Sequence, residues 1–222
     1  MHVLILEAKG NPNIGLFAYA TDNYCLIGPE LAEHAKKIEE VLQVPVHTVT
    51  IAGTGLLGVF LVGNNQQLLI PSIAFEHEEK KLRSITQVDV FETVHTALGN
   101  NLVMNENGIL AGPMFSEEER ERLAKLTNLP VHQFKIADIE VVGSGIVHNS
   151  KGGVIHRDAN QFEIEMAEDT LGLEQLLPGT ASLGSPYVRG SIVANKNGFI
   201  ISESSGGPEI TNADEALGFL ER

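Results

Sequence analysis

The sequence predicts an α/β fold: a closed ring of five β-β-α-β repeats about a pseudo-fivefold axis, built as one domain over residues 1–222. One order, a polar turn, an apolar run and a proline stop, occurs three times. The spacing is constant, because Pro71 follows Pro29 by 42 residues and Pro113 follows Pro71 by another 42. The last repeat lacks one strand, and the N-terminus offers a spare one. The three copies are 21–29 (TDNYCLIGP), 63–71 (GNNQQLLIP) and 105–113 (NENGILAGP).

The first repeat covers about residues 14–55 and shows every element of the unit. Residues 14–19 and 24–27 are apolar and flank a polar turn, which predicts an antiparallel hairpin. A helix is predicted over 29–43, because its apolar residues recur at helical spacing. Residues 44–51 then alternate as a returning strand. The helical stripe consists of Leu31, Ala35, Ile38 and Leu42.

The second and third repeats cover about residues 56–98 and 99–142 and follow the same plan. In the third, Ser116 and Glu119 form a capping-box pattern, which predicts a helix start because the two side chains satisfy free backbone N–H groups. In the second, Glu76 and Lys80 are spaced for an ion pair along a helix. The elements expected in the second repeat are strands at 57–62, 68–70 and 88–91 and a helix at 76–84.

The fourth and fifth repeats, about residues 143–183 and 184–222, are less regular. A weak strand is expected over 173–181, and a short last helix over 216–220. No strand pattern follows that helix, whereas residues 2–7 form a spare strand before the first repeat. We expect residues 1–13 to complete the fifth repeat and to close the ring with no open sheet edge, which would protect it from aggregation.

Composition limits the partners that the chain can have. It carries 29 acidic and 15 basic residues, a formal charge of −14, so phosphate backbones and therefore DNA should be repelled. A basic protein surface is the better-matched partner. The single cysteine, Cys25, excludes an internal disulfide and fits a reducing compartment. The sequence has neither a signal-peptide pattern nor an apolar run of membrane-spanning length, so we expect a cytoplasmic protein without a membrane partner.

Several short motifs stand in order along the chain. They are YCL at 24–26, 63–71, ALGN at 97–100, VGS at 142–144, NSKGG at 149–153, GTA at 179–181 and GS at 184–185. Together they resemble the translation initiation factor 6 family, in its shorter archaeal form. The resemblance implies the pentein ring of five α/β units. It also implies binding to the intersubunit face of the large ribosomal subunit, which prevents premature joining of the small subunit. The main partner would be a basic ribosomal protein beside the sarcin–ricin loop, with limited ribosomal RNA contact, and the factor would act as a monomer.

Two other function classes remain open beside this one. Some pentein rings are enzymes that modify guanidino groups, and those need a nucleophilic cysteine with histidine and acidic partners near the axis. Cys25 lies within a predicted strand, where a packed apolar role is more common, and no cysteine occurs late in the chain. Neither histidine spacing nor a glycine motif indicates a metal or a cofactor, so we expect no catalysis and no cofactor. A ring scaffold for some other protein is the remaining class.

The junctions between repeats are the candidate interaction site. Equivalent loops of a repeat ring collect on one face, where weak local features add up to one broad surface. The junctions are small, polar and glycine-rich, although glycine could also be there for turn geometry alone. Asn100 is the strongest single candidate, because its amide can both donate and accept. The candidate residues are Asn13, Ile14, Gly15, Gly55, Leu56, Gly99, Asn100, Gly143, Ser144, Gly145, Gly184, Ser185 and Tyr187.

Overall fold

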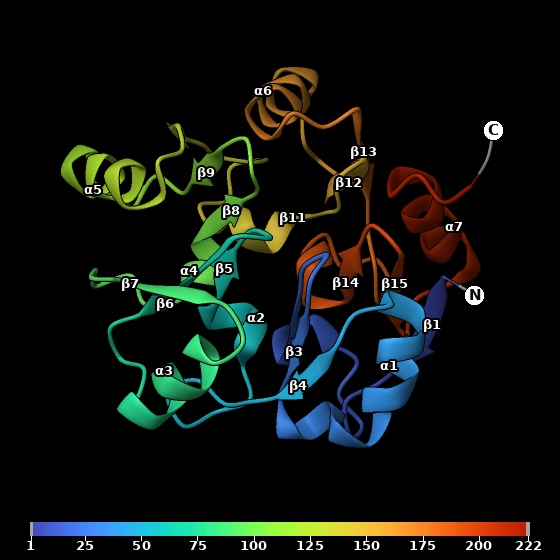
Figure 1. Ribbon diagram of the computed structural model, residues 1–222. Coiled ribbons are helices and arrows are strands. Elements are labelled where there is room, and N and C mark those ends of the chain that lie inside the picture. The colour runs from blue at the N-terminus through green and yellow to red at the C-terminus, as the bar shows by residue number, and fades with distance from the viewer. Residues whose placement is uncertain (1, 221–222) are drawn as a thin grey trace.

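A computed structural model describes residues 2–220 as five units arranged around a central axis, with the longer helices on the outside (Figure 1). Each unit contributes one three-stranded sheet and at least one helix that covers it. The ring of five β-β-α-β repeats predicted from the sequence is therefore confirmed. Among residues 2–220, no helix is long and apolar enough to cross a membrane.

The first two units have the same succession of elements. A one-turn helix at the axis leads into a hairpin, an outer helix and a returning strand. Unit one comprises η1 (Ile14–Phe17), β2 (Ala18–Ala20), β3 (Cys25–Ile27), η2 (Pro29–His34), α1 (Ala35–Leu42) and β4 (Val46–Thr48). Unit two comprises α2 (Leu57–Phe60), β5 (Val62–Gly63), β6 (Gln67–Pro71), α3 (Glu76–Arg83) and β7 (Gln87–Phe91).

The other three units repeat this succession, and the fifth takes its third strand from the N-terminus. Unit three comprises α4 (Leu98–Asn101), β8 (Leu102–Met104), β9 (Ile109–Ala111), α5 (Glu117–Thr127) and β10 (Val131–Gln133). Unit four comprises η3 (Val142–Gly145), β11 (Ile146–His148), β12 (Gly152–His156), α6 (Gln161–Leu171) and β13 (Gln175–Gly179). Unit five comprises η4 (Val188–Gly190), β14 (Ile192–Asn195), β15 (Gly198–Ser202), α7 (Gly207–Ala216) and β1 (Val3–Leu6).

All five sheets share one topology. The first two strands of a unit pair antiparallel, and the third strand pairs parallel to the second on its other side. In unit five, β1 pairs parallel to β15 with Val3 opposite Phe199 and Leu6 opposite Ser202. The N-terminal strand therefore completes the last repeat, as the missing strand in the sequence predicts.

The expectation of a ring without open edges is wrong. The strands form five separate three-stranded sheets, and no ladder joins one described sheet to the next. Backbone pairing runs within each unit, from the hairpin to the returning strand, so neighbouring units meet through packing and not through shared ladders. Each sheet consequently keeps its own outer edge strand.

Side chains from neighbouring units share each hydrophobic core, and this packing closes the ring. One cluster combines Ile27 and Ile38 of unit one with Val193 and Ile200 of unit five. Cys25 lies in the same cluster and is fully buried. Because burial of apolar surface is the main stabilising term in folding, each unit depends on the next for part of its core.

Several predicted elements have different bounds in the structure. The strands expected at 14–19 and 57–62 begin as one-turn helices, η1 and α2, before they enter the hairpin. The last helix is not at 216–220 but at Gly207–Ala216. It begins there because Glu209 accepts a hydrogen bond from the backbone N–H of Gly206 (2.9 Å), so the helix starts nine residues before the expected position 216. The Ser116–Glu119 capping box is confirmed.

Candidate interaction face

The five junction helices form a closed circle around one end of the axis. In chain order, η1 contacts α2, α2 contacts α4, α4 contacts η3, η3 contacts η4, and η4 contacts η1 again. We call these five elements the axial helices. The structure thus brings together the junctions that the sequence analysis expected to share one face.

The axial helices approach one another so closely that glycine is required where they touch. A Cβ atom on Gly58 would overlap the carbonyl oxygen of Gly15, one on Gly99 that of Gly58, and one on Gly143 that of Gly99. A Cβ on Gly15 would likewise overlap the carbonyl oxygen of Arg189, which occupies the equivalent place in unit five. These glycines are therefore explained by backbone packing.

Nearly half of the candidate residues lie inside the ring and cannot form its outer surface. Tyr187 is the most accessible, at 44% exposed, and packs edge-on against the His156 ring. The buried candidates are Ile14, Gly15, Gly55, Gly99, Gly143 and Gly145, so their expected direct contact with a partner is withdrawn: they hold the face and do not form it. The half-buried candidates are Asn13, Leu56, Asn100, Ser144, Gly184 and Ser185.

Asn100 differs from most other asparagines of the chain in having an unused side chain. Asn13 donates to Asn11 Oδ1, and Asn105 and Asn149 bond backbone carbonyls of other segments. Within residues 2–220, the Asn100 amide forms no hydrogen bond. Because it is half-buried on an axial helix, its donors and acceptor are available to a partner.

The turns that precede the axial helices carry two apolar side chains that the sequence analysis missed. Val94 is 86% exposed, and Leu183 is 85% exposed. Leu183 also adopts a positive φ of 62°, a conformation that favours glycine. Large apolar residues within the polar turns 93–96 and 182–185 are the signal that could have identified them.

Glutamates from the outer helices fix these turns across four of the five unit boundaries. Glu78 of α3 accepts hydrogen bonds from Thr50 Oγ1 (2.7 Å) and from the backbone N–H groups of Ala52 (2.7 Å) and Gly53 (2.9 Å). The other three boundaries repeat the contact in part. Glu119 accepts from Thr93 Oγ1 (2.7 Å), Glu163 from the Ala137 N–H (3.1 Å), and Glu209 from Thr180 Oγ1 and the Gly184 N–H (both 2.8 Å).

These hydrogen bonds control the ionisation of the carboxylates. Desolvation by burial would raise the pKa of Glu78, but hydrogen bonds from Phe75, Thr50, Gly53 and Ala52 outweigh it and the pKa is lowered. The pKa values of Glu119 and Glu209 are lowered for the same reason. Glu78, Glu119 and Glu209 are thus ionised at neutral pH where they hold their turns.

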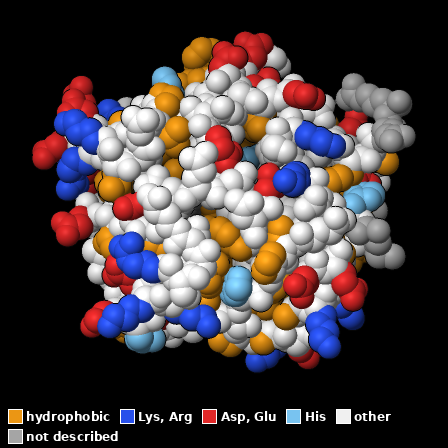
Figure 2. Space-filling model, viewed as in Figure 1, with side chains coloured by type: hydrophobic (Ala, Val, Ile, Leu, Met, Phe, Trp, Pro, Cys, Tyr) orange, Lys and Arg blue, Asp and Glu red, His pale blue; other side chains and the backbone are white. Residues whose placement is uncertain are grey.

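In the view of Figure 2, acidic and basic side chains are spread over the surface, including near its middle, with uncharged areas between them. Burial raises the pKa of the Cys25 thiol to about 12, which favours the thiol over the nucleophilic thiolate. Residues 2–220 contain no group of three or more His, Cys, Asp or Glu arranged to hold a metal ion.

Comparison with known proteins decides the family. Residues 3–216 match the sequence profile of the eIF-6 family. The chain belongs to the eIF-6 family. Relatives named translation initiation factor 6 cover almost the whole chain at about one-third identity. The relative from Pyrococcus furiosus is 35% identical over 231 residues, which cover 99% of this chain and all of the relative. The relative from Pyrococcus abyssi is 33% identical over 230 residues (99% of this chain, 100% of the relative), and that from Haloquadratum walsbyi is 32% identical over 215 residues (96% and 95%).

Solved structures similar to this eIF-6 family member share its fold. A dimethylarginine dimethylaminohydrolase superposes with a TM-score of 0.52 at 12% identity, over 93% of this chain and 74% of that one. An arginine dihydrolase of the cyanobacterial ornithine–ammonia cycle also gives 0.52, at 10% identity, over 78% and 32%. Identities this low show the common pentein fold and not a common activity.

Proposed function

We propose that this protein binds the intersubunit face of the large ribosomal subunit and prevents the small subunit from joining. The observation that carries the proposal is the end-to-end match to archaeal proteins named translation initiation factor 6. The circle of axial helices supports it, because interlocked backbones give a broad face that resists deformation. A rigid surface loses little conformational entropy on binding.

The charge of the protein favours a basic ribosomal protein as the main contact. At −14 it gains nothing from neutralising phosphates, so ribosomal RNA beside the docking site, including the sarcin–ricin loop, would be touched only locally. Opposite charges instead steer the factor toward a basic protein surface and raise the association rate. Association should therefore slow as the salt concentration rises.

Within the face, Asn100 and Tyr187 are the proposed contact residues. Asn100 offers an unused amide, and Tyr187 offers an exposed aromatic ring of the type enriched in interface hot spots. Val94 and Leu183 would add apolar contact at the edge of the same face. The buried candidates act by holding the axial helices that carry these side chains.

Co-sedimentation with separated ribosomal subunits, followed by a subunit-joining assay, tests the proposal. The wild-type protein should sediment with the large subunit only and should inhibit joining in a concentration-dependent way. Asn100→Ala should weaken binding about tenfold, since a hydrogen bond at an interface contributes roughly 1–1.5 kcal/mol. Gln66→Ala is the matched control, because Gln66 is an exposed amide in the β5–β6 hairpin turn, away from the axial helices. Normal joining at saturating protein would refute the function.

We further propose that the protein acts without catalysis, as a monomer in the cytoplasm. The similar solved structures include enzymes, so arginine and methylated arginines are the substrates with which to test this. No product should form, and Cys25→Ala should bind the large subunit like the wild type. Turnover that disappears in Cys25→Ala would favour an enzyme instead.

A further inference from the structure

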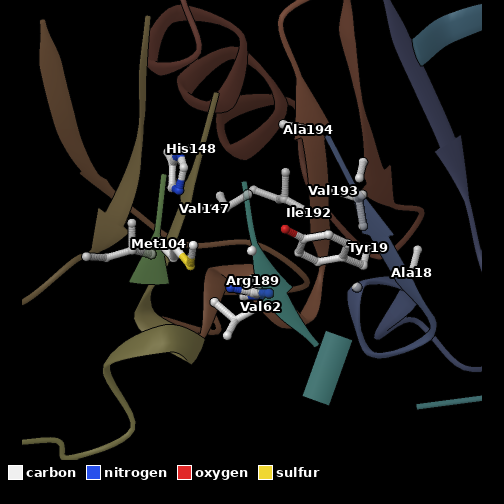
Figure 3. A pocket seen from close by; sticks show the side chains of 14 residues that line it. Ala18, Tyr19, Val62, Met104, Val147, His148, Arg189, Ile192, Val193 and Ala194 are labelled. Carbon is white, nitrogen blue, oxygen red and sulfur yellow. The ribbon is translucent and has the colours of Figure 1, made fainter. Parts of the chain in front are cut away.

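A cavity lies on the axis behind the circle of axial helices (Figure 3). It has a volume of about 80 Å³ and a mostly small, apolar lining. Three polar side chains from different units enter it: Tyr19 of β2, His148 of β11 and Arg189 of η4. A second cavity of about 120 Å³ shares Tyr19 and His148 with the first and reaches the hairpin turns. The two form one path from those turns to the axial helices.

Arg189 breaks the pattern of the axial helices. The other four units have glycine at this place, where backbones touch, and only the fifth unit places a side chain there. The guanidinium group lies in the cavity near Val62 and Met104 (Figure 3). Its Nη2 donates to the carbonyl oxygen of Leu61 (3.2 Å). Close packing of the axial helices does not explain this arginine.

The charge of Arg189 has no protein partner. Among residues 2–220, no carboxylate lies within ion-pair distance of it, although the chain carries 29 acidic residues. A guanidinium has five N–H donors, of which the Leu61 carbonyl takes one. Burial lowers the pKa of Arg189, an effect that disfavours the charged form. By accessible surface the Arg189 residue is half-buried. An anion in the cavity would offset the cost of this partial burial, because a charge partly removed from water is stabilised chiefly by an opposite charge.

The size and the entrance of the path restrict the anion. About 80 Å³ holds a few water molecules or a group of similar bulk, such as a carboxylate on a short chain. Asp22 and Glu106 line the outer cavity near the hairpin turns. Asp22 accepts from the Lys196 N–H (2.8 Å), and Glu106 from the Asn65 N–H (2.8 Å), so both are tied to backbone groups of neighbouring units. A second negative charge on the ligand would meet these two acids.

We propose that the axial cavity is a binding site for a small monocarboxylate, whose oxygens pair with the Arg189 guanidinium beside the axial helices. A planar guanidinium matches a carboxylate in a two-pronged hydrogen-bonded pair, which inorganic chloride cannot form. A ligand that also bears an ammonium group would complement Asp22 and Glu106 near the hairpin turns. The site is separate from the outer surface of the interaction face and requires no ribosome.

Isothermal titration calorimetry on the free, full-length protein tests this inference. Sodium acetate, glycine and sodium phosphate serve as probes at fixed chloride concentration and ionic strength. Acetate should bind saturably to the wild type and at least about tenfold more weakly to Arg189→Gly, which restores the residue found in the other four units. Arg189→Lys should retain part of the affinity, since it keeps the charge but loses the planar fork. Arg157→Gly removes an exposed arginine and should bind acetate like the wild type.

Comparison of the three probes identifies which chemical group the site binds. Glycine binding as tightly as acetate, or more tightly, supports the proposal, and tighter binding adds a role for Asp22 and Glu106. Binding of phosphate without acetate or glycine would overturn the carboxylate assignment. The site itself would be overturned if the wild type showed no saturable acetate binding, or if Arg189→Gly bound acetate with the same affinity as the wild type. If circular dichroism shows that Arg189→Gly does not fold, Arg189→Lys takes its place. Weaker acetate binding in Arg189→Lys than in the wild type then supports the site, and equal affinity overturns it.

Discussion

Glu78→Gln is the most direct perturbation of the contacts that hold the junction turns. The Glu78 side chain is 2% exposed, and its two oxygens accept four hydrogen bonds. Oε1 accepts from Thr50 and Gly53, and Oε2 accepts from Ala52 and Phe75. Glutamine keeps the shape but replaces one oxygen by an NH₂ group, which cannot accept. In either orientation of the amide, at least one part-buried backbone N–H therefore loses its acceptor.

The expected cost follows from these contacts. A buried donor left without an acceptor costs about 1–3 kcal/mol, and the remaining bonds weaken because the acceptor is no longer charged. Together these effects should lower the free energy of unfolding by about 2–4 kcal/mol. With a urea dependence of about 2–3 kcal/mol per molar, the unfolding midpoint should fall by roughly 1 M.

Urea titration followed by circular dichroism measures this change. Glu79→Gln is the matched control, since Glu79 lies next to Glu78 on α3 but forms only a helix-surface ion pair with Arg83 (2.8 Å). Such pairs contribute less than about 1 kcal/mol, so its midpoint should hardly move. Equal midpoints for Glu78→Gln and Glu79→Gln would refute the view that this carboxylate stabilises the boundary between units.

Three further predictions concern the whole ring. The folded pKa of Glu78 is lowered, so its contribution to the free energy of unfolding is complete above the unfolded pKa of about 4.3. That contribution is lost as the pH falls through the folded pKa. The free energy of unfolding should therefore fall less steeply with acid in Glu78→Gln than in the wild type. Deleting residues 1–9 removes the partner of β15 and should lower the melting temperature, with an unchanged melting temperature counting against ring closure. Gly99→Ala should destabilise by several kcal/mol, because its Cβ would overlap the carbonyl oxygens of Gly58 and Leu61; Gly207→Ala, where the added Cβ meets open space, is the control for the same urea titration.

The sequence alone determined the number and order of the repeats and the strand that completes the fifth. The 42-residue spacing of Pro29, Pro71 and Pro113 is a local property, because each proline ends a strand in its own unit. The Ser116 capping box is equally local, since its partners lie within one helical turn. The spare strand at the N-terminus is visible by counting strands, and its pairing with β15 needed no knowledge of the packing.

Only the tertiary structure decided what the junctions are. The axial helices are one turn long, and their contacts come from residues about 40 positions apart, so no local pattern separates them from the strands that follow. For the same reason, the sequence could not distinguish a buried glycine such as Gly99 from an accessible neighbour such as Asn100. In the sequence, Glu78 is indistinguishable from the other acidic residues of a solvent-exposed helix face. Only the structure shows that it accepts hydrogen bonds from Thr50 and Ala52 of the preceding unit. Arg189 is unremarkable in sequence, because its role depends on the cavity that all five units enclose.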